Sequence, residues 1–100
     1  MTYALQKVEG HGGDSGKMSD LYTPITDEDG NFIDAKITHN ARPEVGSVIR
    51  VGAHYARSYS SQDWWQTTLI TEILKEWTDE HGTEFVEFKT ENSTYIWKHF

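Results

Sequence analysis

The 100-residue sequence contains no cysteine, only two prolines and no long apolar run. Without cysteine, disulfides, thiolate metal ligands and cysteine nucleophiles are excluded. No window approaches the roughly 18 apolar residues that a transmembrane helix requires, and the N-terminus lacks the basic and apolar regions of a signal peptide. These absences predict a cytoplasmic protein with no membrane partner.

Basic residues are also scarce, because nine Lys and Arg stand against sixteen Asp and Glu, for a net charge of -7. A negatively charged chain is repelled by phosphate backbones unless its few cations cluster. A chain of this length forms one domain at most. We therefore expect a single domain over residues 1–100, in which aromatic residues supply much of the buried apolar area.

The C-terminal third carries all four tryptophans and predicts three strands, with short turns at 78–82 and 90–93. Apolar residues between 64 and 77 fall at helical spacing, which favours a helix when the period is taken alone. The adjacent tryptophans and the many β-branched residues favour a strand, and we predict the strand. The doubled pairs Leu69-Ile70 and Ile73-Leu74 then require a bulge, or a strand that is partly buried on both faces.

The N-terminal region, residues 1–40, predicts a short strand at 2–8 and then a flexible glycine-rich loop at 9–20. Residues 21–26 and 32–38 flank an Asp-Gly turn, which is the pattern of a β-hairpin. Pro24 lacks a backbone N–H, so we expect its strand at a sheet edge. A further strand is expected at 45–51, before a polar loop that precedes Trp64.

The order of elements from residue 45 onward resembles that of SH3-like barrels: a strand, a long polar loop, a long strand and two strands joined by a very short turn. The glycine in Val45-Gly46-Ser47-Val48 also resembles the opening strand of that group. The runs Trp-Gln-Thr-Thr-Leu-Ile-Thr-Glu-Ile-Leu and Phe-Lys-Thr-Glu-Asn-Ser-Thr-Tyr-Ile-Trp are similar to segments of small uncharacterised proteins of tailed phages. The resemblance covers residues 45–100 and implies a small β domain. Together with the hairpin pattern, it predicts a mainly β fold, a small antiparallel SH3-like barrel or rolled sheet with its core at 45–100 and an N-terminal β-hairpin extension.

Short motifs give no catalytic signature. Gly13-Asp14-Ser15-Gly16 matches the tetrad around a serine protease nucleophile, but 100 residues cannot form the two barrels that such a protease needs. Gly16-Lys17 lacks the other residues of a phosphate-binding loop, and the Asp and Asn residues at 27–31 lack the glycine and glutamate positions of a calcium loop. The five histidines show no metal-binding spacing. We therefore expect no enzyme activity, no cofactor and no metal.

Arginines interleave with aromatic residues between strand 45–51 and the tryptophan pair, and all three arginines of the chain lie at 42–57. Arg and aromatic residues together are typical of protein-interface hot spots and of stacking surfaces for single-stranded nucleic acid. The simplest alternative is a solubilising loop beside one core tryptophan. The candidate partner-binding residues are Arg50, His54, Tyr55, Arg57, Tyr59, Trp64 and Trp65.

The composition and this cluster predict a non-enzymatic protein-binding module, because the acidic balance disfavours nucleic acid. If the source is viral, as the resemblance implies, the natural specific form is a modulator or inhibitor of a host protein such as a defence protein, acting in the host cytoplasm. The alternative is a nucleic-acid-binding small β-barrel that uses the same Arg and aromatic face. An exposed sheet edge in so small a fold also predicts pairing of two copies into a homodimer.

Overall fold

The computed structural model describes residues 2–53 and 64–100, which form nine β-strands and no helix. The prediction of a mainly β protein is confirmed. The strands are β1 Tyr3–Lys7, β2 Gly13–Gly16, β3 Met18–Thr26, β4 Phe32–Thr38, β5 Val48–Gly52, β6 Trp64–Gln66, β7 Ile70–Thr78, β8 Glu84–Thr90 and β9 Thr94–His99.

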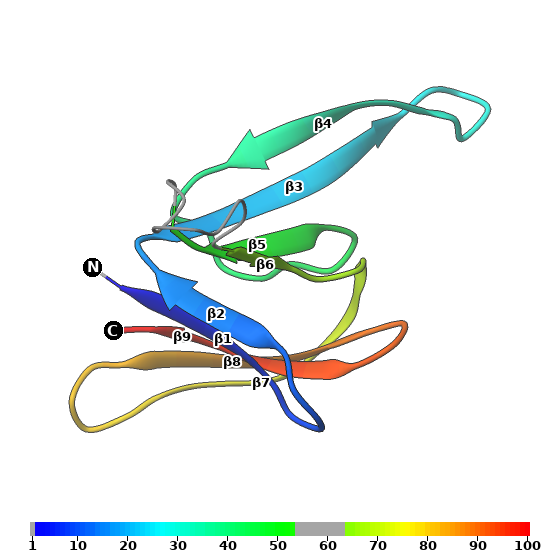
Figure 1. Cartoon of the computed structure of the whole chain (residues 1–100). Helices are drawn as coiled ribbons and strands as arrows, with labels where there is room; N and C mark the ends of the chain where they lie inside the picture. Colours follow the sequence, from blue (N-terminus) through cyan, green and yellow to red (C-terminus); the bar gives the residue numbers. More distant parts are fainter. Residues whose placement is uncertain (1, 54–63) are drawn as a thin grey trace.

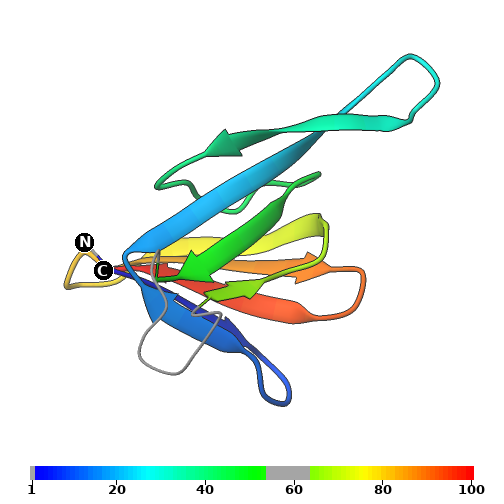
Figure 2. The same ribbon diagram turned by 45° about the horizontal axis from the view of Figure 1, so that its top comes forward.

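The strands form two antiparallel sheets, one in the order β2-β1-β9-β8-β7 and the other in the order β4-β3-β5-β6. Figures 1 and 2 show the four-stranded sheet lying over the five-stranded sheet. Within the described residues the two sheets do not join into a closed barrel. Gly16 at the end of β2 lies against the backbone of Gly52 on β5, and Ile70 at the start of β7 donates its N–H to the carbonyl of Ser47. These contacts hold the sheets together along both sides.

The core lies between the sheets and follows the alternation of the strands, in which successive side chains point to opposite faces. On β9, Trp97 and Tyr95 point inward, with exposed fractions of 0% and 6%. The N-terminal region is part of this core and is not an extension of it, since β1 lies between β2 and β9. The buried apolar cluster contains Tyr3, Leu5, Leu21, Ala41, Ile49, Val51, Ile70, Val86, Phe88, Tyr95 and Trp97.

The strand prediction for residues 64–77 is confirmed in place of the helix, although one expected strand is two. β6 ends at Gln66 in the four-stranded sheet, and β7 begins at Ile70 in the other sheet. Of the doubled apolar pairs, Leu69 lies before β7 and is exposed while Ile70 is buried. Register shifts follow within β7, between Ile70 and Glu72 and between Ile73 and Lys75. Irregularities of this kind change which side chains face the core. Helical spacing in this segment therefore reflects two interrupted strands.

The expectation of a flexible loop at residues 9–20 is wrong, because β2 and the start of β3 occupy this stretch. Its glycines permit close backbone packing. A Cβ on Gly13 would lie 2.0 Å from the carbonyl oxygen of Leu5, and one on Gly16 would lie 2.2 Å from the carbonyl oxygen of Gly52. Real Cβ atoms do not approach backbone so closely, so only glycine fits at these two positions.

The predicted hairpin is confirmed as β3 and β4, whose register runs from Leu21 opposite Thr38 to Thr26 opposite Phe32. Its tip projects away from both sheets (Figure 2). The edge position expected from Pro24 holds only locally. The first part of β3 pairs with β5 as far as Tyr22, whereas Pro24 lies beyond that pairing and has only β4 beside it. The missing N–H of Pro24 therefore removes no bond to β5.

The turn between β3 and β4 is closed by the Asp27 carboxylate. Its Oδ1 atom accepts hydrogen bonds from the backbone N–H groups of Asp29 and Asn31, both at 2.9 Å. The backbone N–H of Asn31 is the largest of the causes that lower the pKa of Asp27. The predicted turn is therefore present, and the Asp27 side chain makes it an Asx turn.

The strand expected at 45–51 begins only at Val48. Gly46 has a φ of +87° and lies in a turn that Ser47 closes by donating its N–H to the carbonyl of Glu44. The glycine that resembled part of an opening strand is therefore a turn glycine, since a positive φ favours glycine.

Candidate functional site

The structure describes three of the seven candidate binding residues and separates them onto two faces. Arg50 lies on β5, and Trp64 and Trp65 lie next to each other on β6. In the register, Arg50 is opposite Gln66, and Trp64 is opposite Gly52, so Arg50 and Trp64 share the outer face of the four-stranded sheet. The other four residues, His54, Tyr55, Arg57 and Tyr59, lie outside the described residues.

The Arg50 guanidinium lies between two aromatic rings. Its Cζ atom is 3.8 Å from the centre of the Trp64 ring and 4.7 Å from the centre of the Tyr22 ring. Its Nη2 and Nε atoms donate hydrogen bonds of 2.7 and 3.2 Å to Oε1 of Gln66. A cation held against ring faces and bonded in this way has little rotamer freedom left to lose on binding.

Trp65 faces the other way and belongs to the interior. It is half-buried, packs against the apolar core, and donates its Nε1 hydrogen to the Tyr95 hydroxyl at 3.3 Å. A Cβ on Gly12 would lie 2.8 Å from its ring, so the β1–β2 loop closes over this side chain. The structure therefore does not bring Trp65 together with Arg50.

Several members of the outer face were not among the sequence candidates, and one of them is the buried Asp20, which lies directly opposite Arg50 in the register. Tyr22 on β3 and Gln66 on β6 flank Arg50, because β5 lies between these two strands. The alternation of β3 places Tyr22 opposite Val48, on the same face as Arg50. The hairpin pattern predicts which face of β3 Tyr22 occupies relative to its neighbours. It does not predict that Tyr22 pairs with Val48 on β5, which lies 26 positions away in the sequence.

The outer face of the five-stranded sheet carries a second aromatic pair. Trp77 and Phe85 stack with ring centres 4.9 Å apart and an interplanar angle of 1°. Lys75 Nζ lies 4.9 Å from the Trp77 ring centre, and Lys98 Nζ lies 5.9 Å from that of Phe85. This pair was not predicted as a site. Like the Arg50 and Trp64 pair, it places a basic side chain beside an aromatic ring, but here the two rings also stack on each other.

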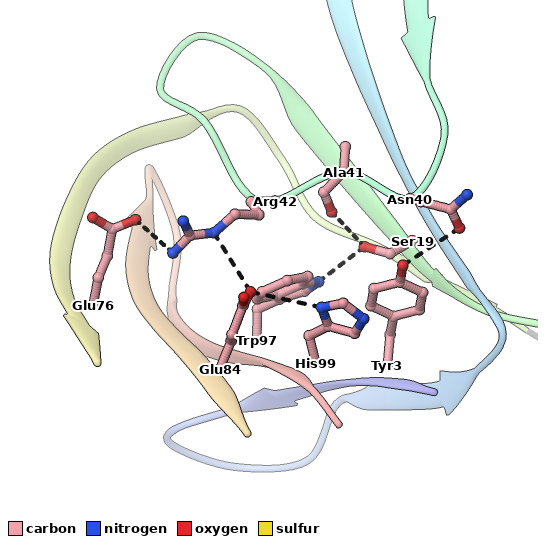
Figure 3. Close-up of polar contacts among 9 residues, drawn as sticks. All are labelled: Tyr3, Ser19, Asn40, Ala41, Arg42, Glu76, Glu84, Trp97 and His99. Atoms are coloured by element: carbon pink, nitrogen blue, oxygen red, sulfur yellow. Dashed lines mark hydrogen bonds and ion pairs between the residues drawn. The ribbon is translucent and has the colours of Figure 1, made fainter. Parts of the chain in front are cut away.

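A polar cluster joins the segment between β4 and β5 to the five-stranded sheet (Figure 3). Arg42 Nη2 is 3.1 Å from Oε1 of Glu76, and Arg42 Nε is 4.0 Å from Oε2 of Glu84. Nδ1 of His99 lies 3.6 Å from the same Glu84 oxygen. These contacts link Arg42 to β7 and β8, and His99 of β9 to β8.

The phenol of Tyr3 lies beside this cluster. Its ring stacks on His99 at 4.6 Å, and its hydroxyl donates to Oδ1 of Asn40 at 3.4 Å. Burial raises the pKa of the Tyr3 phenol, and the negative charges of Glu84 and Asp20 raise it further. The raised pKa keeps the Tyr3 phenol protonated at neutral pH, in the form that donates to Asn40.

Comparison of the chain with protein-family models, with curated proteins and with solved structures gave no match. In the described ranges, no group of three His, Asp or Glu side chains is placed to hold a metal ion. No helix in the part of the chain that the structure describes is long and apolar enough to cross a membrane.

Proposed function

We propose that this protein is a non-enzymatic protein-binding module that contacts its partner through the outer face of the four-stranded sheet. The observation that carries the proposal is the Arg50 guanidinium held between Trp64 and Tyr22. Tryptophan, tyrosine and arginine are the residues most enriched among binding hot spots. Here all three are assembled on one sheet face by three adjacent strands.

Preorganisation supports the choice of this face. Arg50 donates two hydrogen bonds to Gln66, so its guanidinium plane is already oriented before any partner arrives. The main entropic cost of using an arginine in an interface is the ordering of its long side chain. That cost is smaller for Arg50 than for a solvated arginine, which makes a contact through this residue more favourable.

The charge balance ranks a protein partner above nucleic acid. The net charge of -7 opposes a polyanion, and binding to phosphates relies on several cations that each displace counterions. On the described part of the face, the single arginine directs two of its donors to Gln66. A nucleic-acid interface built on aromatic stacking remains the alternative proposal, and a steep loss of binding with added salt would identify it.

The resemblance of residues 45–100 to small phage proteins supports a narrower form of the proposal. In this form the protein is an SH3-like phage protein that modulates or inhibits a host protein, such as a defence protein, in the host cytoplasm. The two packed antiparallel sheets are consistent with a small β module of this kind, although fold alone assigns no function.

The test compares partner capture by the wild-type protein and by three variants from cells of the native source. Trp64→Ala and Arg50→Ala remove the two central groups of the face. Trp77→Ala is the matched control, because it removes a half-buried tryptophan with a neighbouring cation from the other sheet. Partners identified by mass spectrometry are then titrated against each purified variant.

We expect Trp64→Ala or Arg50→Ala to weaken binding by about 1–2 kcal/mol or more, which is roughly five- to thirtyfold in Kd. Trp77→Ala should bind as the wild type does. Equal affinity of the wild type and both face variants for every captured partner would reject this face as the interface.

A further inference from the structure

β4 has an exposed edge in the described structure. It is the first strand of its sheet, with β3 as its neighbour on one side only, and six of its seven residues are exposed. Figure 1 shows β4 as the outermost strand of its sheet. Ile33 and Ile37 are 62% and 49% exposed, although they are large apolar side chains. A long, apolar edge strand is a template for pairing with another strand.

The sequence of β4 is complementary to itself in the antiparallel direction. The strand reads Phe-Ile-Asp-Ala-Lys-Ile-Thr, with Ala35 at its centre. If two copies pair around a two-fold axis at Ala35, each Asp34 lies opposite the other copy's Lys36. Each Ile33 then lies opposite the other copy's Ile37. Opposite charges and apolar side chains placed directly across from each other are the cross-strand pairs that stabilise a sheet.

The backbone of β4 at Ala35 is oriented for this pairing. Ala35 is opposite Pro24, which has no N–H to donate, and the N–H of Ala35 bonds instead to its neighbour's carboxylate, Oδ1 of Asp34, at 2.8 Å. The backbone groups of Ala35 therefore point away from β3 and toward the free edge. Two Ala35 residues on facing strands can exchange both backbone hydrogen bonds.

The same geometry favours the ion pairs. Residues on either side of a hydrogen-bonded pair form the non-hydrogen-bonded pairs, in which the side chains come closest. With Ala35 as the hydrogen-bonded centre, Asp34 and the facing Lys36 occupy such a pair on each side of the axis. In the dimer, Asp34 gives up its hydrogen bond from the Ala35 N–H and pairs with the other copy's Lys36. The Ala35 N–H then donates to the carbonyl of the other copy's Ala35.

From this we propose that two copies of the chain associate through β4, antiparallel and centred on Ala35, to extend the four-stranded sheet into an eight-stranded one. The interaction is isologous, so both copies use the same strand. It leaves Arg50 and Trp64 uncovered, because β5 and β6 lie on the far side of β3 from β4. The proposal goes beyond partner binding, because the dimer would carry two copies of the proposed binding face in one continuous sheet. One strand edge is a small interface, so the dimer should dissociate on dilution.

The test measures sedimentation velocity of the full chain over a wide concentration range, for the wild type and charge variants of β4. Asp34→Lys and Lys36→Asp each place like charges across the axis in two places at once. Each should raise the dimer Kd about tenfold or more. An equimolar mixture of these two variants restores opposite charges and should form a heterodimer. The double variant, Asp34→Lys with Lys36→Asp, also restores them and should form a homodimer. Lys89→Asp, on an exposed position of β8, is the matched control and should leave the Kd unchanged.

Ala35→Pro removes the central donor without removing a bond to β3 and should also weaken the dimer. Circular dichroism confirms that each variant is folded. A wild-type protein that stays monomeric at the highest concentration overturns the proposal. A dimer that forms equally well in both charge variants also overturns it, because the contact then lies elsewhere. If an extended peptide from another protein binds this edge while the chain itself stays monomeric, the occupant proposed here is wrong.

Discussion

Removing the buried Ser19 hydroxyl should destabilise the protein far more than removing the hydroxyl of an exposed residue. Ser19 and Trp97 are both 0% exposed. The Ser19 Oγ accepts a hydrogen bond from Nε1 of Trp97 at 2.9 Å and donates one to the carbonyl oxygen of Ala41, also at 2.9 Å. One hydroxyl therefore joins β3, β9 and the segment after β4 (Figure 3).

The magnitude follows from what the Ser19→Ala variant leaves behind. It leaves the indole N–H of Trp97 and the carbonyl of Ala41 without their partner in a dry site. Each unpaired buried polar group costs about 1–3 kcal/mol, so for two groups we expect a loss of roughly 2–6 kcal/mol. For a chain of this size that corresponds to a fall in Tm of about 10 °C or more.

The assay is urea unfolding followed by tryptophan fluorescence, with the free energy taken from the linear dependence on urea. Thr68→Ala removes a hydroxyl from an exposed residue and should change stability by less than about 0.5 kcal/mol. In a cycle with Trp97→Phe, the two changes should show a coupling of about 1 kcal/mol or more. A Ser19→Ala protein as stable as the Thr68→Ala control would refute the role of this hydroxyl.

Three further predictions concern backbone packing and pH. Gly16→Ala should lower the free energy of unfolding in urea by more than about 2 kcal/mol, because the new Cβ meets the Gly52 carbonyl. The control Gly10→Ala has open space around it and should cost about 1 kcal/mol for its positive φ. Equal losses in the two variants would contradict the close approach of Gly16 to Gly52. Burial raises the pKa of Tyr3, and the charges of Glu84 and Asp20 raise it further. Folded Tyr3 therefore keeps its proton at pH values where the unfolded chain has lost it, so the free energy of unfolding should fall as pH rises above 10.0. Tyr3→Phe should flatten that alkaline slope, and an unchanged slope would assign the effect to other groups. The lowered pKa of Asp27 has the opposite effect: it adds to the free energy of unfolding at neutral pH, and this contribution is lost as pH falls below 3.8. Asp27→Asn should therefore reduce the loss of stability in acid, and an identical acid slope in the variant would contradict this.

Local patterns predicted much of the fold. The hairpin of β3 and β4 followed from an Asp-Gly turn between apolar strands, and the structure adds that Asp27 holds this turn. The doubled apolar residues of β7 predicted an irregular strand, and the register shifts lie beside Ile70 and Ile73. In each case the decisive interactions join residues that are close in the sequence, which is why the sequence was informative.

The glycine-rich segment was predicted wrongly because its constraint is not local. Gly16 is required by the backbone of Gly52, which lies 36 residues further along the chain. A cluster of glycines is equally compatible with a flexible loop and with a strand that must pack closely against another backbone. Only the sheet arrangement distinguishes the two.

The candidate site was predicted in part for the same reason. Arg50 and Trp64 were candidates from composition, and the structure brings them to 3.8 Å. The third member, Tyr22, comes from the N-terminal hairpin, and its place depends on the pairing of β3 with β5. Trp65 was grouped with its neighbour by composition, but adjacent residues of a strand point to opposite faces.

The most direct test of the proposed interface places a photo-crosslinking amino acid at residue 64 or at residue 77 and irradiates the protein with its captured partner. The two positions carry half-buried tryptophans on the outer faces of the two different sheets. We predict cross-links to the partner from position 64 and none from position 77. Cross-links from position 77 alone would show that the partner binds the five-stranded sheet and would contradict the account.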